Sequence, residues 1–269
     1  MLKRREKSRR GFFGAGSSEV DTIKTLLIRV SFDTDREDEL SSIATELQGD
    51  FDLTPNGRSI IDPTPHNRSY FDSHMTGLAN YFRYQSCGRL KIEWVIMPEG
   101  EDESYKLSDL ADYGPGGSGI WTIERLVTFF RHCIEAADQE EGCTFPFGEY
   151  DAIIIAHAGA NLQSDIDFDT PNDIPSFFAT LGDDDIFTVG SGDTIFDGSV
   201  VPETAIQDGF NGGIAAVLAH EFGHQLGLPD LYNIYTNGPV VGEWDNMDSG
   251  GLLGAYLEDE EGRYHYAEG

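Results

Sequence analysis

The chain has 269 residues, enough for one sizeable domain or for one domain of two lobes. It carries 48 Asp and Glu against 18 Lys and Arg, a net charge of −30 that argues against nucleic acids and anionic membranes as partners. No segment approaches the roughly 18 consecutive apolar residues of a transmembrane helix. The acidic balance suits an extracellular, salt-tolerant or calcium-binding protein, and it suits equally a protein that is simply kept soluble.

The N-terminal segment is basic, unlike the rest of the chain. Its first ten residues include Lys3, Arg4 and Arg5 and resemble the start of a signal peptide. The following residues 11–16 are too few and too rich in glycine to form the apolar core of such a peptide. We expect residues 1–20 to be a disordered leader or linker.

Apolar periodicity predicts strands that alternate with helices, which is typical of a mixed α/β sheet. A near-continuous apolar run at Asp151–Ala158 predicts a central strand that is buried on both faces. The other predicted elements are a strand at Thr25–Phe32, a short helix at Leu40–Gln48, a helix at His74–Ser86, a strand at Leu90–Met97 and an amphipathic helix at Trp121–Ala137.

The segment Ser164–Asp193 is rich in Asp, Gly, Pro and Asn. Carboxylates among turn residues are suitable Ca²⁺ ligands, but the spacing of an EF-hand is absent. A solvated acidic loop is therefore the favoured interpretation, with a structural calcium site as the alternative.

Three cysteines are too few to indicate a disulfide framework, and they fit a secreted enzyme and a cytosolic protein equally well. Cys133 and Cys143 could form a bridge, and Cys87 is expected to be a small core residue. His66, His74 and His265 lie in polar stretches and are predicted to be solvated.

The most informative segment runs from His220 to Asp230 and reads H-E-x-x-H-x-x-G-x-x-D, the zinc-binding signature of metallopeptidases. Residues four apart on a helix lie on one face, about 6 Å apart along the axis, so His220 and His224 can bind the same metal. Glu221 lies about 100° around the helix and is placed to hold a metal-bound water. The alternative is a chance match on a buried amphipathic helix.

The residues after the second histidine make this alternative weaker. Gly227 can adopt the left-handed conformation that ends a helix, and Pro229 prevents the helix from resuming. The resulting turn would bring Asp230 to the metal as third ligand, leaving one position open for water. Upstream, an apolar stripe packs on the core, consisting of Ile214, Leu218, Phe222 and Leu226.

A methionine follows the third ligand. Met247 lies 17 residues after Asp230, in the glycine-flanked segment Gly242–Gly250, and the chain has only four methionines. This arrangement is typical of the Met-turn of metzincins, in which the thioether forms an apolar floor under the metal.

Several motifs together resemble the immune inhibitor A-type metallopeptidases, a bacterial secreted group with metzincin character. The resemblance covers roughly residues 23–252 and rests on Gly227–Tyr232 followed by Trp244–Gly250, on Ser199–Glu203, on Tyr81–Leu90 and on Ala156–Gly159. Asn233 stands where the family commonly has Asp, so a calcium or second-layer role at that position does not carry over.

The resemblance implies a metzincin-like fold with a mixed, mostly parallel, twisted sheet over the zinc helix. In such enzymes an edge strand lines the cleft, and we expect Gly198–Glu203 to be that strand, binding an extended substrate by strand addition. The predicted organisation is a leader at 1–20, a catalytic lobe at 21–227 and a smaller lobe at 228–269, which carries the third ligand and the Met-turn and is shorter than the family suggests.

The resemblance further implies a secreted, monomeric zinc endopeptidase that acts on proteins or peptides and binds structural calcium. Zinc held by His220, His224 and Asp230 would lower the pKa of a bound water, with Glu221 as general base. Tyr232 and Tyr235 are both candidates for stabilising the oxyanion. Two alternatives stay open, a non-catalytic protein that uses the metal for stability, and a chance motif on a carbohydrate- or protein-binding module.

Overall fold

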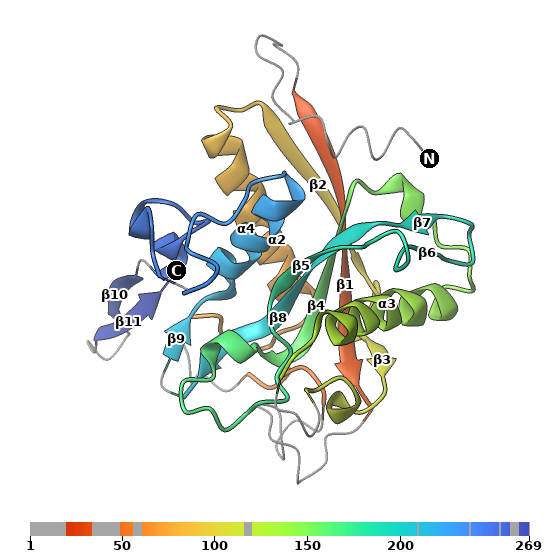
Figure 1. Ribbon diagram of the computed structural model, residues 1–269, viewed down its shortest axis with the longest axis horizontal. Helices are drawn as coiled ribbons and strands as arrows, with labels where there is room; N and C mark the ends of the chain where they lie inside the picture. The colour runs from red at the N-terminus through yellow and green to blue at the C-terminus, as the bar shows by residue number, and fades with distance from the viewer. Residues whose placement is uncertain are drawn as a thin grey trace.

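The computed structural model describes residues 20–33, 49–55, 61–115, 120–208, 210–236, 238–252, 254–258 and 264–268 (Figure 1). The predicted leader at 1–20 lies almost entirely outside these residues, and the predicted helix at 40–48 lies wholly outside them. Within them, three α-helices accompany a mainly parallel sheet, so the mixed α/β class is confirmed. The helices are α2 (Arg68–Gln85), α3 (Ile123–Glu140) and α4 (Ile214–Gln225).

The sheet follows the order β10-β11-β9-β8-β4-β1-β2, with β3 paired to β1 and β5 paired to β8. Strands β2, β1, β4 and β8 run parallel to one another, whereas β5 and β9 run antiparallel to β8. The strand bounds are β1 (Asp21–Phe32), β2 (Leu90–Met97), β3 (Tyr105–Leu107), β4 (Ala152–Ala160), β5 (Phe177–Thr180), β8 (Asp197–Gln207), β9 (Phe210–Gly212), β10 (Gly254–Glu258) and β11 (Tyr264–Glu268), with a separate pair β6 (Phe187–Thr188) and β7 (Thr194–Ile195).

The centre of the sheet is built as the apolar runs predict. Every residue of β4 is buried, and β1 pairs with it through Leu27 opposite Ile154. Parallel strands that are covered on both faces need such continuous apolar sequences. Flanking side chains begin the two long helices, since Asn67 accepts a hydrogen bond from the amide of Tyr70 and Thr122 accepts one from Arg125.

Helices cover both faces of the sheet. Along β8, Gly198 lies against the Phe130 ring of α3, because a Cβ added there would come within 2.6 Å of it. The next residue, Ser199, donates from Oγ to the main-chain oxygen of Glu221 in α4 at 3.1 Å. Neighbouring residues of a strand point to opposite faces, so α3 and α4 cover opposite sides (Figure 1). Helix α2 packs beside α4 through Phe82 and Phe222.

The predicted edge strand at Gly198–Glu203 is wrong. Its strand, β8, is interior, because β4 pairs with one side while β5 and β9 pair with different parts of the other. The four-residue strand β5 was not predicted, and it takes up the edge that β8 would otherwise expose. Among the described residues, no helix is both long and apolar enough to cross a membrane.

Three predictions for individual side chains also need correction. Cys87 is exposed at a positive φ of 54°, in the turn after α2, so it is not a core residue. Cys133 and Cys143 do not form a bridge, since both are free. His66 is buried and His74 is mostly covered, each beside a carboxylate. The His265 side chain lies outside the described residues. The division into two lobes stays a prediction.

Candidate active site

Helix α4 presents both histidines of the motif on one face. Their ring centroids lie 4.8 Å apart at an interplanar angle of 90°. Helix α4 ends at Gln225, and Gly227 lies just after its end with a φ of +85°. The amide of Gly227 donates to the oxygen of His224 at 2.8 Å, and the amide of Leu228 donates to that of Gly223 at 3.0 Å. These two bonds form a Schellman motif, which reverses the chain and brings Asp230 back toward the histidines, as predicted.

Three potential ligand atoms converge at this point. Oδ1 of Asp230 lies 3.3 Å from Nε2 of His220 and 3.2 Å from Nε2 of His224. The three atoms lie within 4.8 Å of one another. Although Oδ1 of Asp230 is buried, it accepts no hydrogen bond from any described residue. A buried carboxylate oxygen without a donor is costly, so this arrangement calls for a cation.

The other ring nitrogens fix the protonation of both histidines. Nδ1 of His220 lies 2.8 Å from the main-chain oxygen of Asn246, and Nδ1 of His224 lies 2.9 Å from that of Leu228. A carbonyl can only accept, so each Nδ1 donates its proton and each Nε2 is left to face the convergence point. Two imidazole nitrogens and a carboxylate oxygen are the donor set of a catalytic zinc site, and the residues therefore fit this metal.

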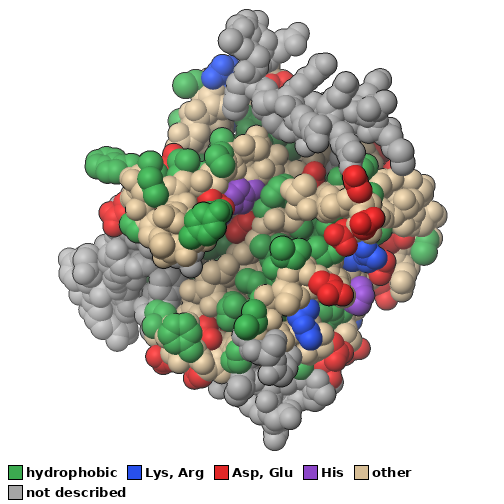
Figure 2. All heavy atoms as spheres, in the orientation of Figure 1, with side chains coloured by type: hydrophobic (Ala, Val, Ile, Leu, Met, Phe, Trp, Pro, Cys, Tyr) green, Lys and Arg blue, Asp and Glu red, His purple; other side chains and the backbone are tan. Residues whose placement is uncertain are grey.

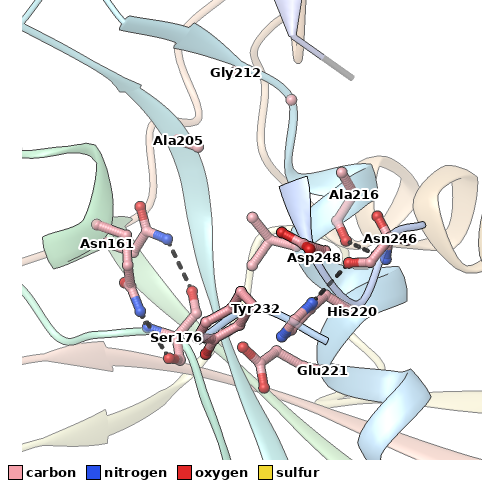
Figure 3. A pocket seen from close by; sticks show the side chains of 13 residues that line it. Asn161, Ser176, Ala205, Gly212, Ala216, His220, Glu221, Tyr232, Asn246 and Asp248 are labelled. Atoms are coloured by element: carbon pink, nitrogen blue, oxygen red, sulfur yellow. Dashed lines mark hydrogen bonds between the residues drawn. The ribbon is translucent and has the colours of Figure 1, made fainter. Parts of the chain in front are cut away.

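Glu221 lies beside the ligands and is buried, with 6% of its surface exposed. Burial raises its pKa to about 8, and the nearby Asp230 carboxylate adds to the rise. A bound cation would oppose both effects. In Figure 3, Glu221 and Tyr232 face the same cavity as His220, so a group at the metal lies within reach of the glutamate.

Met247 packs under the helix between the two histidines. It is 4% exposed, and a Cβ added to Gly223 would lie 2.6 Å from its Sδ. Because Gly223 has no side chain, the Met247 sulfur fits against the helix at this position. The H-E-x-x-H motif allows any residue here, so it does not indicate that glycine is needed. The carbonyl of Met247 accepts a hydrogen bond from Leu231 at 2.8 Å, which connects this residue to the third-ligand segment.

Two aspartates that sequence reasoning missed organise the segment around Met247. Oδ2 of Asp248 accepts hydrogen bonds from the amides of Val240, Val241 and Gly242 at 2.7–2.9 Å. Desolvation acts against ionisation of Asp248, but these donors outweigh it and lower its pKa to about 2. Oδ1 of Asp245 accepts from the Met247 amide at 2.9 Å. Asp and Asn in tight turns form such bonds to nearby amides, so the turn sequence was the available signal.

The two tyrosines that compete for an oxyanion role differ in position. Tyr232 lines the cavity, with its ring 6.3 Å from that of His220, whereas Tyr235 is 91% exposed. Burial raises the pKa of Tyr232, and the charge of Asp230 adds to this rise. In Figure 2, histidine side chains are visible near the centre of the face, in a hollow bordered by acidic and apolar side chains.

The acidic loop brings three carboxylates together elsewhere. Ligand atoms of Asp165, Asp169 and Asp208 lie within 4.8 Å of one another. The carboxylate of Asp165 already accepts from the amides of Asp169 and Thr170, and Oδ2 of Asp208 accepts from those of Ile166 and Asp167. These bonds account for the cluster as turn structure, and calcium has no support here.

Residues 138–267 match the sequence model of the family described as immune inhibitor A peptidase M6, catalytic domain. This part of the chain is similar to the catalytic domain of the M6 peptidases. A search of curated proteins gave no match. The M6 match spans just under half of the chain and includes α4, Asp230 and Met247, so it confirms the resemblance where its motifs are densest. It supports a metallopeptidase, and hence a hydrolase that acts on proteins and uses a metal.

Proposed function

We propose that this protein is a zinc-dependent endopeptidase in which His220, His224 and Asp230 hold the metal and Glu221 is the general base. The observation that carries the proposal is the convergence of two Nε2 atoms on a buried carboxylate oxygen that has no hydrogen-bond donor among the described residues. Zinc bound here would supply Lewis acidity, which makes water a nucleophile near neutral pH.

The protein's own groups then move the protons. Glu221, ionised in the field of the cation, accepts a proton from the attacking water and returns it to the leaving amine. Its buried position excludes bulk water from this transfer. Tyr232 is the better placed of the two tyrosines to donate a hydrogen bond to the oxyanion, since it lines the cavity that Tyr235 does not reach.

We propose that an extended substrate binds along the edge of β5 and not along β8. Strand β5 pairs only with β8 among the described strands, and it packs beside α4. The ring of Phe178 in β5 lies 6.0 Å from that of His224. A peptide added to the open edge of β5 would run near His224, and its main chain would supply the hydrogen bonds.

We also propose that Met247 forms a Met-turn of metzincin type and that the protein is secreted and acts as a monomer. The packing of Met247 against Gly223 supports the Met-turn. The family resemblance supports secretion. A non-catalytic metal-stabilised protein remains the competing function. It is disfavoured because a structural site has no need of a buried glutamate beside an open ligand position.

The decisive experiment measures casein hydrolysis and zinc content for the wild type and for Glu221→Gln. We expect activity to fall on the order of 1,000-fold in the variant while zinc stays near one per chain. Glu124→Gln, which changes an exposed glutamate of α3, is the matched control and should be fully active. Wild type that binds zinc but cleaves nothing would favour the binding protein, and wild type without zinc would refute the proposal.

A further inference from the structure

A cavity of about 260 Å³ opens directly beside the proposed general base (Figure 3). His220 and Glu221 form part of its wall, together with Tyr232. Clefts that hold a whole ligand usually measure roughly 300–1,000 Å³, so this cavity is of a size for one side chain rather than for a length of peptide. The inference below rests on the proposed peptidase function.

One side of the cavity wall is made of small residues. They come from the end of β8, from β9 and from the first turn of α4, and they are Ala205, Gly212, Gly213, Ala216 and Val217. Small side chains at these positions leave the space open, and their apolar surface favours a substrate side chain with an apolar stem.

A polar pair lies on the other side of the cavity from α4 (Figure 3). Nδ2 of Asn161 donates to Oγ of Ser176 at 2.9 Å, and both residues are buried. Oγ of Ser164 lies 2.8 Å from Oδ1 and from the main-chain oxygen of Asn161, and its one proton is shared between them. Gln163 holds the main chain of Ser176 by two further bonds, at 2.8 and 2.9 Å.

These bonds determine what the polar pair offers to a ligand. Because the Ser176 oxygen accepts from Asn161, its hydroxyl proton is directed elsewhere, and no described residue receives it. The Ser176 hydroxyl therefore offers its proton on this side of the cavity. A substrate side chain that ends in an acceptor can receive it.

The charges around the cavity disfavour an acidic side chain. Glu221 and Asp248 are the ionisable carboxylates of its wall, and no Lys or Arg lines it. An acidic substrate side chain would be repelled by these carboxylates.

We propose that this cavity binds the side chain of a substrate residue next to the scissile bond, and that Ser176 favours a side chain that is not acidic and ends in an acceptor. Tyrosine and glutamine meet both conditions. Phenylalanine fits the apolar wall but lacks the acceptor, so it provides the sharpest comparison.

The test uses zinc-loaded enzyme and a set of peptides that differ at one position, carrying Tyr, Phe, Gln, Glu or Lys. Mass spectrometry first identifies the cleaved bonds, and kcat/KM is then measured for each peptide. We expect Tyr to exceed Phe by about threefold to tenfold, the effect of one neutral hydrogen bond, and Glu to be the poorest. In Ser176→Ala the Tyr-to-Phe ratio should fall to about one, while Phe cleavage is retained.

Two further variants serve as controls for this result. Ser73→Ala removes an exposed hydroxyl on α2 and should keep the wild-type ratio. Ala216→Leu fills the cavity without touching the polar pair, and it should lose both Tyr and Phe peptides while cleaving peptides with Ala at that position. Wild type that cleaves without preference, or a Ser176→Ala ratio equal to the wild-type ratio, would overturn the selectivity and leave the peptidase intact. Failure of wild type to cleave any peptide would overturn both.

Discussion

Two clusters in this molecule each combine two histidines with two carboxylates, and they differ in what the ring nitrogens face. In the first, which we call the buried cluster (His66, His74, Asp62 and Glu203), His66 has an acceptor at each nitrogen. Nδ1 lies 2.6 Å from Oε1 of Glu203, and Nε2 lies 2.9 Å from the oxygen of Asp62. A ring that donates from both nitrogens is protonated.

In the second, the ligand cluster (His220, His224, Asp230 and Glu221), only one nitrogen of each ring has an acceptor from the main chain. The other nitrogens converge on an oxygen that accepts no hydrogen bond from the described part of the chain. The same side-chain types thus build a self-sufficient ion pair in one place and an incomplete site in the other. Counting histidines and carboxylates in a sequence does not separate the two, whereas the partner of the second ring nitrogen does.

The two clusters are connected through Asp62. Its Oδ2 accepts a hydrogen bond from the amide of Ile214 at 2.7 Å, at the first residue of α4. The residue before it, Gly213, has no side chain to cap the helix. The buried cluster therefore holds the helix that presents the ligand cluster.

The largest expected effect is on the ligand cluster. Asp230→Asn should lower kcat/KM on the order of 1,000-fold and deplete zinc, because a charged ligand is lost. Without metal, the Asp230→Asn variant should unfold at the same urea concentration as wild type without metal, or at a higher one. The reason is that a buried oxygen without a donor contributes nothing to stability. A clear loss of stability in the metal-free variant would show that Asp230 has a structural role instead.

The buried cluster should show the reverse pattern. In Glu203→Gln, an amide replaces a carboxylate that accepts from His66, Asp52 and Gly159, so the chain should lose about 3–5 kcal/mol of unfolding free energy. Zinc binding by the folded fraction should persist. The control is Glu93→Gln, which breaks an exposed pair with Lys91 and should leave the urea midpoint unchanged. Equal effects of the two variants would remove the distinction between the clusters.

A smaller effect concerns the floor of the ligand cluster. Gly223→Ala places a methyl group 2.6 Å from Sδ of Met247, and such overpacking should cost about 1–3 kcal/mol. Gly77→Ala in α2 meets no atom within 4 Å, so it should stabilise the chain by about 0.5–1 kcal/mol through helix propensity alone. Thermal unfolding of both variants measures the difference, and similar shifts in the same direction would contradict the packing of Met247.

The smallest effect is a pH dependence from the buried cluster. Burial opposes protonation of His66, but the hydrogen bond and charge of Glu203 outweigh it and raise its pKa above 6.5. The groups that face it are Glu203, Asp62 and the ring of Tyr70, with His74 paired to Asp62. Since the folded pKa is raised, this stabilisation is complete below about pH 6.5 and is lost as the pH rises through the raised value.

Urea midpoints measured from pH 6 to 9 test this dependence. Subtracting the unfolding free energy of Glu203→Gln from that of wild type removes the contribution of other titrating groups. The remaining difference comes from the His66–Glu203 pair, and it should shrink as the pH rises. A constant difference would mean that His66 keeps one protonation state throughout.

Local patterns predicted much of the fold and of the site. The bounds of β2 and the left-handed Gly227 follow from residues within one turn or strand, and the structure has both as predicted. The proposed ligands also lie within one short segment, so helix spacing and the turn at Gly227 were enough to bring them together.

Long-range partners set the limit of this reasoning. His66 has a polar sequence neighbourhood, and the Glu203 that buries it lies 137 positions away. Strand β8 became interior because β5, only four residues long, pairs with it, and so short a segment carries little periodic signal. Asp62 is remote from α4 in sequence, so no helix-capping pattern could indicate it.

The orientation of His220 has a consequence for the making of the protein. Its Nδ1 is held by the main chain of Asn246, and its helix starts against Asp62. The ring is thus positioned by segments that leave the ribosome far apart in time. A nascent chain whose synthesis has reached Gly227 contains the whole H-E-x-x-H motif but not Asp230 or Asn246. The proposed metal site therefore cannot assemble before translation has passed Asn246.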